Sequence, residues 1–435
     1  MSIYKKKSVS KKIQLQTKIT FRTYPALPYI LKWLLICFVV GSCVGSMSAG
    51  FLQSLEWVTQ FREEHLSIIY LLPVGGLLIG LLYHYFGTNV EAGNNLLLRT
   101  IYKPEGKIPL KMAPFVYVGT LVTHLLGGSA GREGTALQMA GAVADQFSKP
   151  FRLSEEERKI LLIAAIAAGF GSVFGVPLAG AVFGLELVMI GRIRYNAVFP
   201  AFMASVIADW VTKLWHTKHT VYVVGTIPDV SLLTVCYAVL AGILFGWCAA
   251  TFSKSMHALG RFFKAKINYP PLRPFVGGIV VLLVVWLLGT TDYLGLGIPM
   301  IEASFLQQQP FYVFALKMAF TIVTLSSGFK GGEVTPLFFI GAALGSALSF
   351  FIPLPTGLLA AMGFVAVFAG ATNTPLACTL MAMEMFGSEC GVFVAIACVV
   401  AYLLSGANGI YSEQIIGEPK NLRFMYQQGR SLKDL

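Results

Sequence analysis

The chain has 435 residues, of which 56% are hydrophobic and only 12% are charged, and its formal net charge is +12. Soluble globular proteins carry about twice this share of charged residues, so the composition excludes a soluble enzyme and predicts an integral membrane protein. The basic excess suggests nucleic acid as a partner. No nucleic-acid-binding motif accompanies it, and we therefore expect none to be bound.

A basic segment, residues 1–26, precedes the first long apolar stretch. Its basic residues, with no acidic residue among them, are Lys5, Lys6, Lys7, Lys11, Lys12, Lys18 and Arg22. Positive charge next to membrane helices accumulates on the cytoplasmic side. The segment therefore predicts a cytoplasmic N-terminus and a multi-pass protein of the cell membrane.

Apolar stretches then recur along the chain as far as residue 404. A full membrane span needs about 20 apolar residues, and several of these stretches are shorter, which predicts half-helices and re-entrant segments. We expect an all-α polytopic membrane protein with a first membrane repeat at 27–213 and an aromatic, polar connector at 214–230. A second repeat follows at 231–412, and a short tail at 413–435 ends the chain.

Two internal repeats indicate that the membrane region is a duplication. Residues 131–137 read GREGTAL and residues 331–337 read GGEVTPL, with matching Gly, Glu, Thr and Leu. A second pair, the stretches 177–186 and 375–384, begins with PLA and ends with Glu in both copies. Glycine-rich turns that open into apolar helices, meeting near the bilayer midplane, are typical of transporters, where half-helix N-termini offer N–H groups to an anion.

Glu133 is the strongest functional candidate because it is a carboxylate within an apolar region. Ionisable groups inside a membrane are costly and usually functional. A structural alternative is that Glu133 pairs with Arg132 or caps the helix that follows. The flanking glycines leave the carboxylate free to move, so it can occupy an anion site when ionised and leave it when protonated, which couples a proton to an anion.

Three motifs resemble the CLC family of chloride channels and proton-coupled anion transporters. Residues 131–135 resemble its GREGP motif, residues 331–336 resemble its GGxFxP motif, and Tyr411 follows the last apolar segment as its pore-facing tyrosine does. The resemblance implies a homodimer with one anion pathway per subunit. It also implies an inverted repeat of tilted, broken and re-entrant helices, with Glu133 as the external gating glutamate.

Departures from the family pattern indicate one of its branches. Most members have GSGIP where this chain has GNNLL at residues 93–97, and the proline of GREGP is Thr135 here. Glu333 and Val334 replace an Ile-Phe pair, and Leu187 stands where chloride exchangers carry an inner proton-transfer glutamate. The combination resembles the fluoride-exporting branch.

Fluoride is small and strongly hydrated, so a site for it must replace water with firm hydrogen-bond donors. Asn94, Thr335 and Tyr411 offer such donors. Backbone N–H groups of the two motifs complete the expected site: those of Arg132, Glu133, Gly134, Glu333 and Val334. Asn94 is alternatively a helix cap, with Asn95 the competing ligand, and Thr335 is alternatively the cap of its own half-helix.

The inner proton route has one candidate, Glu333, because Leu187 cannot carry protons; a mere helix cap is the alternative for Glu333. Glu186 and Glu384 are either a proton relay or acceptors of hydrogen bonds from helix ends, and we favour the second. His124 is interpreted as a histidine satisfied within the helix bundle, with a proton-path role as the alternative. The sequence predicts no metal site and no cofactor.

The predicted function is secondary active fluoride/proton antiport that exports fluoride from the cytoplasm. A chloride/proton exchanger and a passive anion channel of the same fold are the alternatives. An intramembrane hydrolase would need a nucleophile and a base, and Ser129 with His124 is a poor version of that pair without a supporting motif. We therefore expect an ion transporter and not an enzyme.

Overall fold

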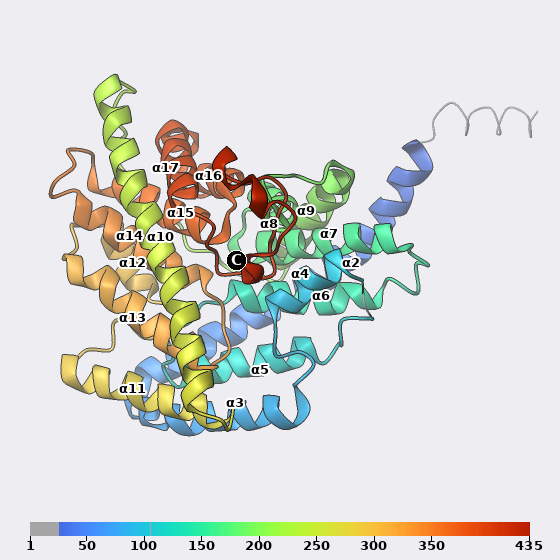
Figure 1. Cartoon of the computed structure of the whole chain (residues 1–435), viewed down its shortest axis with the longest axis horizontal. Coiled ribbons are helices and arrows are strands. Elements are labelled where there is room, and N and C mark those ends of the chain that lie inside the picture. The colour runs from blue at the N-terminus through green and yellow to red at the C-terminus, as the bar shows by residue number, and fades with distance from the viewer. Residues whose placement is uncertain (1–25, 105) are drawn as a thin grey trace, which may run out of the picture.

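The computed structural model describes residues 26–104 and 106–435, so the basic residues predicted to lie in the cytoplasm fall outside the described part. That part is almost entirely helical (Figure 1). Its α-helices are α2 (Ala26–Glu64), α3 (Leu72–Phe86), α4 (Asn94–Tyr102), α5 (Met112–Leu125), α6 (Glu133–Gln146), α7 (Glu155–Phe174), α8 (Pro177–Leu187), α9 (Val198–Leu214), α10 (Leu232–Lys266), α11 (Leu272–Leu288), α12 (Ile298–Leu306), α13 (Phe311–Ser327), α14 (Val334–Leu348), α15 (Thr356–Thr372), α16 (Pro375–Phe386) and α17 (Gly391–Leu404).

Short elements join these helices. The 3₁₀ helices are η1 (Leu66–Leu71), η2 (Tyr195–Ala197), η3 (Ser388–Cys390), η4 (Leu422–Gln427) and η5 (Leu432–Asp434). The two strands, β1 (Met189–Ile190) and β2 (Ile415–Ile416), pair in parallel. This pairing ties the tail of the chain to the connection between α8 and α9.

Helix length divides the described elements into two groups. Four helical segments are long and apolar enough to cross a membrane: Leu27–Glu64, Leu66–Phe86, Tyr195–Leu214 and Leu232–Lys266. Others are much shorter, down to 9 residues in α4 and α12. Helices that short cannot span a bilayer alone, and their backbone ends must be satisfied by neighbouring protein.

Local sequence explains several helix boundaries. Ser154 and Glu157 form the reciprocal capping box that begins α7, and this motif is legible in the sequence. Pro177 and Pro375 each begin one of the short helices α8 and α16, where the missing proline N–H is not needed. The same residue type therefore begins the corresponding helix in each half.

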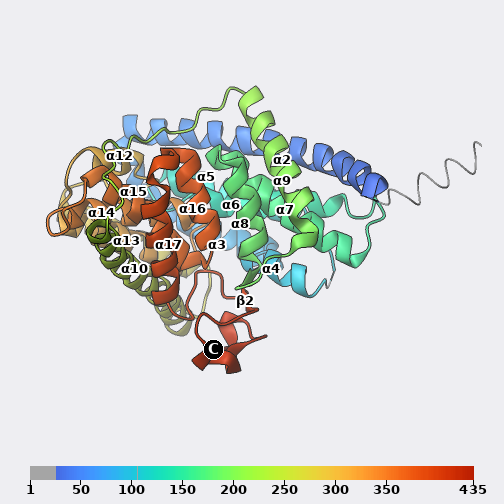
Figure 2. The ribbon, with the colours of Figure 1, turned by 90° about the horizontal axis from the view of Figure 1, so that it is seen from above.

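The two halves of the chain pack side by side. In Figure 1 the first half, in blue and green, lies mainly on the right, and the second half, in yellow to red, lies mainly on the left. Figure 2 shows α2 along one face of the helical body and the end of the chain on the opposite side. Extensive helix pairs include α14 with α15, α7 with α9 and α10 with α17, and of these helices α7, α14 and α15 are the most deeply buried.

Phenylalanine rings join the halves where they meet. Phe170 of α7 stacks on Phe183 of α8 with ring centroids 4.1 Å apart, and Phe338 of α14 stacks on Phe364 of α15 at 4.0 Å. Phe368 contacts both pairs, at 5.8 Å from Phe183 and 5.2 Å from Phe338. This aromatic cluster packs α7 and α8 of the first half against α14 and α15 of the second half.

Glu186 and Glu384 exchange helix caps between the halves. Glu186, near the end of α8, accepts hydrogen bonds of 3.2 and 2.9 Å from two backbone N–H groups in the first turn of α16. Glu384, near the end of α16, accepts hydrogen bonds of 3.0 and 2.7 Å from the first turn of α8. The expectation that both carboxylates accept hydrogen bonds from helix ends is confirmed, and each satisfies N–H groups that a short helix leaves free.

Candidate functional site

The two glycine motifs pair directly with each other. The N–H of Gly131 donates to the carbonyl of Gly332 at 2.6 Å, and the N–H of Gly332 donates to the carbonyl of Gly131 at 2.7 Å. A side chain at Gly332 would place its Cβ 2.6 Å from the nitrogen of Gly134, so only glycine permits this approach. The consequence is that α6 and α14 begin next to each other, with their N-termini at one place.

Glu133 reaches across this junction to the opposite half. Its side chain is fully buried, and its carboxylate accepts from the Thr335 hydroxyl at 2.6 Å and from the Thr335 backbone N–H at 3.1 Å. Arg132 adds its backbone N–H at 3.1 Å and its Nε at 3.3 Å. The carboxylate thus occupies the N-terminus of α14, where a free anion would find N–H donors and the positive end of the helix dipole.

These contacts bear on both structural alternatives for Glu133. The pairing with Arg132 exists, but it is one of several contacts. Glu133 opens its own helix, α6, and its carboxylate bonds to the start of α14. The Thr335 hydroxyl donates its hydrogen bond to Glu133, and the N-cap residue of α14 is Glu333. The interpretation of Thr335 as a cap of its own half-helix is therefore wrong.

Asn94 begins α4 beside the same junction. Asn94 does not cap the helix, because the N-cap residue of α4 is Gly93 and no side-chain cap hydrogen bond is formed. The Oδ1 atom of Asn94 is buried and has no partner among the described residues. A Cβ at Gly134 would lie 3.0 Å from Asn94 Nδ2, which locates the amide at the start of α6. Asn95, the competing candidate, instead accepts the Glu413 N–H at 3.2 Å.

Two further predicted residues carry buried polar atoms without a partner in the described part of the chain. Tyr411 is almost fully buried, yet its hydroxyl is unpaired. Glu333 occupies the N-cap position of α14 but makes no capping hydrogen bond, so its interpretation as a helix cap is wrong. Its unpaired Oε2 would lie 3.4 Å from a Cβ at Gly134. Buried polar groups are normally satisfied, so such unpaired atoms indicate a place for water or a ligand.

The predicted backbone donors come from the two loops that the glycine pairing joins. They are the N–H groups of Arg132, Glu133, Gly134, Glu333 and Val334, and that of Arg132 already donates to Glu133. The structure therefore brings the donors of both motifs, Glu133, Thr335 and the Asn94 amide to one junction.

Residues of α5 form hydrogen bonds with the loop that carries Glu133 and with the first turn of α6. The ring nitrogens of His124 lie 2.9 Å from the Thr120 carbonyl and 3.0 Å from the Ala130 carbonyl. The Thr120 hydroxyl lies 2.6 Å from the Thr135 hydroxyl. A neutral imidazole donates to only one of these two carbonyls, so His124 lies within the bundle with one ring nitrogen hydrogen-bonded and the other facing a second acceptor. Thr135 ties the loop to α5 where the related motif has proline.

Sequence reasoning missed an ionic cluster that holds α4. Glu413 accepts hydrogen bonds from Arg99 at 2.5 and 3.1 Å and from Lys433 at 2.8 and 3.0 Å. The Glu413 N–H also holds Asn95, next to Asn94. No local sequence pattern predicts this cluster, because its members are separated by up to 334 positions along the chain.

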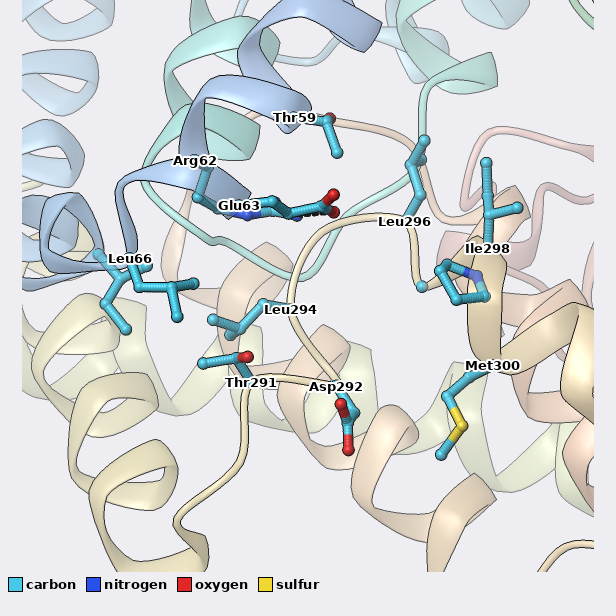
Figure 3. Close-up of a pocket in the computed structure, with 13 residues that line it drawn as sticks. Thr59, Arg62, Glu63, Leu66, Thr291, Asp292, Leu294, Leu296, Ile298 and Met300 are labelled. Atoms are coloured by element: carbon cyan, nitrogen blue, oxygen red, sulfur yellow. Dashed lines mark hydrogen bonds and ion pairs between the residues drawn. The ribbon is translucent and has the colours of Figure 1, made fainter.

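A cavity of about 190 Å³ lies at the end of α2, away from the predicted site residues (Figure 3). It is lined by residues such as Thr59, Arg62 and Asp292, and by none of the predicted site residues. Arg62 donates to the carbonyl of His124 at 2.9 Å. Fully buried Lys317 donates to two backbone carbonyls of the loop that borders this cavity, at 3.0 and 2.7 Å. A lysine within an apolar span was the sequence signal that could have identified this region.

A family model and a sequence relative both place this chain among chloride-channel-type proteins. A family model described as voltage gated chloride channel matches residues 75–406. A protein of Pseudomonas syringae pv. tomato named "Chloride/fluoride channel protein" is 52% identical over 403 residues, which cover 91% of this chain and 89% of the relative.

Solved structures agree with this family. The crystal structure of a CLC-type fluoride/proton antiporter is 35% identical, with a TM-score of 0.85 over 87% of this chain and 96% of that one. A slow cyanobacterial Cl⁻/H⁺ antiporter, 21% identical, shares the fold with a TM-score of 0.77 over 87% of this chain and 96% of that one. The predicted all-helical fold of short, tilted helices is thereby confirmed. This chain belongs to the voltage gated chloride channel (CLC) family, whose members are multi-pass membrane channels and transporters and not enzymes.

Proposed function

We propose that this chain is a secondary active fluoride/proton antiporter that exports fluoride from the cytoplasm. The relative named as a chloride/fluoride channel protein and the solved fluoride/proton antiporter support fluoride as the anion. The observation that carries the proposal is the Glu133 carboxylate held by the Thr335 N–H and hydroxyl at the start of α14. A carboxylate in that position competes with a free anion for the same donors.

Proton coupling follows from this competition. Ionised Glu133 keeps the α14 terminus occupied, and protonation removes the charge that the N–H groups and the helix dipole stabilise. Neutral Glu133 then leaves, and fluoride takes over the donors. When Glu133 gives up its proton and returns, it displaces fluoride, so one ion moves for each protonation of the same group.

Fluoride selectivity rests on donors that can replace its water. The Asn94 amide, the Thr335 hydroxyl and the Tyr411 hydroxyl are assigned this role, together with the backbone donors of the two motifs. The donor assigned at Asn94 is its Nδ2, which lies at the start of α6, whereas its unpaired Oδ1 is an acceptor and does not bind an anion. The Tyr411 hydroxyl is buried without a partner in the described structure, so its O–H is free to donate to fluoride. Buried and unpaired groups of this kind gain the most from a small anion that accepts strong hydrogen bonds.

Glu333 is assigned to the inner proton route. Leu187 is buried and apolar, so the position that carries an inner glutamate in chloride exchangers cannot transfer protons. Glu333 lies at the opposite motif, with an unpaired carboxylate oxygen beside Gly134. It is the carboxylate nearest in sequence to the α14 terminus that Glu133 occupies.

The energetics favour export. Inward proton movement and outward fluoride movement carry charge in the same sense. With one of each per cycle, the membrane potential contributes about 4 to 5 kcal/mol at about 100 mV. This is about three orders of magnitude in the fluoride ratio across the membrane.

Passive anion flow is the alternative function, and Leu187 together with the name of the Pseudomonas relative favours it. Proteoliposomes under an imposed pH gradient separate the two. An antiporter moves fluoride against its own gradient and moves protons in a fixed ratio to it, whereas a channel only dissipates the fluoride gradient. A chloride/proton exchanger would show the same coupling with chloride preferred over fluoride.

The assembly is proposed to be a homodimer, the state that the family resemblance implies. Its interface is proposed to lie on α8, α9 and α16, which expose the large apolar side chains of Leu178, Val206, Trp210 and Leu376. Cross-linking in liposomes at high lipid-to-protein ratio tests this assembly, and a monomer at every ratio would contradict it.

The chain is also proposed to consist of membrane repeats at 27–213 and 231–412, joined by the connector 214–230 and followed by the tail 413–435. The N-terminus is assigned to the cytoplasm from its basic residues. Labelling of a cysteine introduced at residue 8 by an impermeant reagent in intact cells would contradict that orientation.

A further inference from the structure

A second cavity, of about 500 Å³, lies between the end of α17 and the tail of the chain. Its apolar wall includes Ile190, Leu403, Leu404 and Phe424, and its polar wall includes Lys420. The volume is in the range of about 300 to 1,000 Å³ that holds small-molecule ligands. None of the residues assigned to the anion site lines this cavity.

The position of the cavity places it where a membrane helix ends. α17 finishes at Leu404, and Leu403 is 49% exposed on its last turn. Exposed leucine at the end of an apolar helix faces acyl chains in a bilayer. The cavity therefore opens where hydrocarbon gives way to water.

The outer edge of the cavity is formed by η4 (Leu422–Gln427). Leu422 is 83% exposed and Tyr426 is 63% exposed, and Met425 also faces outward. Arg423 is exposed between them. Outward apolar and aromatic side chains interleaved with a basic residue are the composition of a segment that lies in the interface of an anionic membrane.

The Lys420 ammonium is the group in this cavity that can bind an anion. Its ammonium donates to the Tyr402 carbonyl at 2.7 Å and to the Ser405 hydroxyl at 2.9 Å, and it lies 4.2 Å from the centre of the Tyr402 ring. An ammonium has three donors, so one is left for a ligand. It forms no ion pair among the described residues; nearby Glu418 pairs with Arg192 instead. Burial lowers the pKa of Lys420 to about 7, and an anion beside it would favour the charged form.

We propose that this cavity binds an anionic phospholipid, with its phosphate at Lys420 and an acyl chain along Leu403, Leu404 and Phe424. The apolar wall and the exposed residues of η4 match the chain of a lipid, and Lys420 with Arg423 matches its headgroup. A free phosphate would leave the apolar wall uncovered. The site is independent of the proposed transport function, because it stands on different residues.

Thermal unfolding of the purified full-length protein in a neutral detergent tests the proposal. Added phosphatidylglycerol should raise the midpoint of unfolding by several degrees, since a ligand of the folded state stabilises it by mass action. Phosphatidylcholine with identical acyl chains should raise it little. Native mass spectrometry should find phosphatidylglycerol retained on the protein.

Variants locate the effect. Lys420→Met should weaken the apparent phosphatidylglycerol affinity at least tenfold. Arg423→Gln leaves the buried contacts intact and should weaken it by about fivefold, the effect of one basic residue near an anionic surface. Arg261→Gln, which removes an exposed charge on α10, is the matched control and should change nothing.

Several outcomes would overturn the proposal. One is an equal response to the two lipids; another is an unchanged response in both Lys420→Met and Arg423→Gln. A shift of the same size with glycerol phosphate alone would make the ligand a soluble anion. If Lys420→Met does not fold, Arg423→Gln alone decides the outcome. A response that appears only as a change in oligomeric state would assign the surface to a second copy of the chain.

Discussion

Replacement of Glu133 by Gln removes the group on which coupling depends while keeping its size. The carboxylate accepts hydrogen bonds from Thr335 N–H, Thr335 hydroxyl, Arg132 N–H and Arg132 Nε. An amide has only one accepting oxygen. If that oxygen keeps the Thr335 hydroxyl, the NH₂ group faces the two backbone N–H donors, and both charge-assisted hydrogen bonds are lost.

The loss of these two hydrogen bonds sets how much less tightly the side chain at position 133 is held at the α14 terminus. Each hydrogen bond to a charged group is worth about 1.5 to 3 kcal/mol, so the occupied position is weakened by about 3 to 6 kcal/mol. This is about two to four orders of magnitude in the occupancy of the α14 terminus by the side chain. The amide should therefore leave the terminus open to anions and should be unable to release a proton.

Proteoliposomes with fluoride and pH electrodes measure both consequences. Glu133→Gln should show fluoride movement that continues down its gradient, with no proton movement coupled to it. Glu186→Gln is the matched control, because Glu186 also accepts two backbone N–H groups but lies outside the site. It should lower thermal stability and leave the coupling ratio unchanged. Near-normal proton-driven fluoride transport in Glu133→Gln would refute the assignment of the gate.

Three further predictions concern the neighbours of Glu133 and the tail. Asn94→Ser should narrow the preference for fluoride over chloride, measured as the ratio of efflux rates; an unchanged ratio in a folded variant would move selectivity to other donors. Glu333→Gln should impair proton-coupled export without altering assembly, and unchanged transport at several internal pH values would remove Glu333 from the proton route. Burial acts to raise the pKa of Glu413, but hydrogen bonds from Arg99 and Lys433 outweigh it and lower the pKa. The stability that this cluster adds should therefore be complete above about pH 4.5 and lost as the pH falls further. Wild type and Glu413→Gln should then unfold at converging temperatures at acid pH, and a constant gap between them would contradict this.

The sequence was sufficient to predict that the two glycine motifs meet, but not to predict the hydrogen bonds between them. Glycine turns with a carboxylate in apolar surroundings are local signals, and the duplication indicated that the two motifs correspond. The hydrogen bond from Thr335 to Glu133 joins residues 202 positions apart. No periodicity or local spacing encodes it, because it depends on how the two halves pack.

The choice between Asn94 and Asn95 shows the same limit more sharply. Asn94 and Asn95 are adjacent residues of the same type on one short helix, so the local sequence does not distinguish their roles. What separates them is the Glu413 N–H, 318 positions away, which engages Asn95 and leaves the Asn94 amide at the site. Glu413 itself is held by Arg99 and Lys433, and ionic contacts between distant surface-like residues have no signature in composition or hydropathy.

The exchange of carboxylates between α8 and α16 has a consequence for how the protein can be made. Each short helix depends on the opposite half for the acceptor at its N-terminus, so a half synthesised alone would bury a helix end with nothing to receive its N–H groups. Two fragments divided within 214–230 should accumulate when they are co-expressed and be degraded when either is expressed alone. The ancestral single repeat could have met the same requirement only by pairing with a second copy of itself.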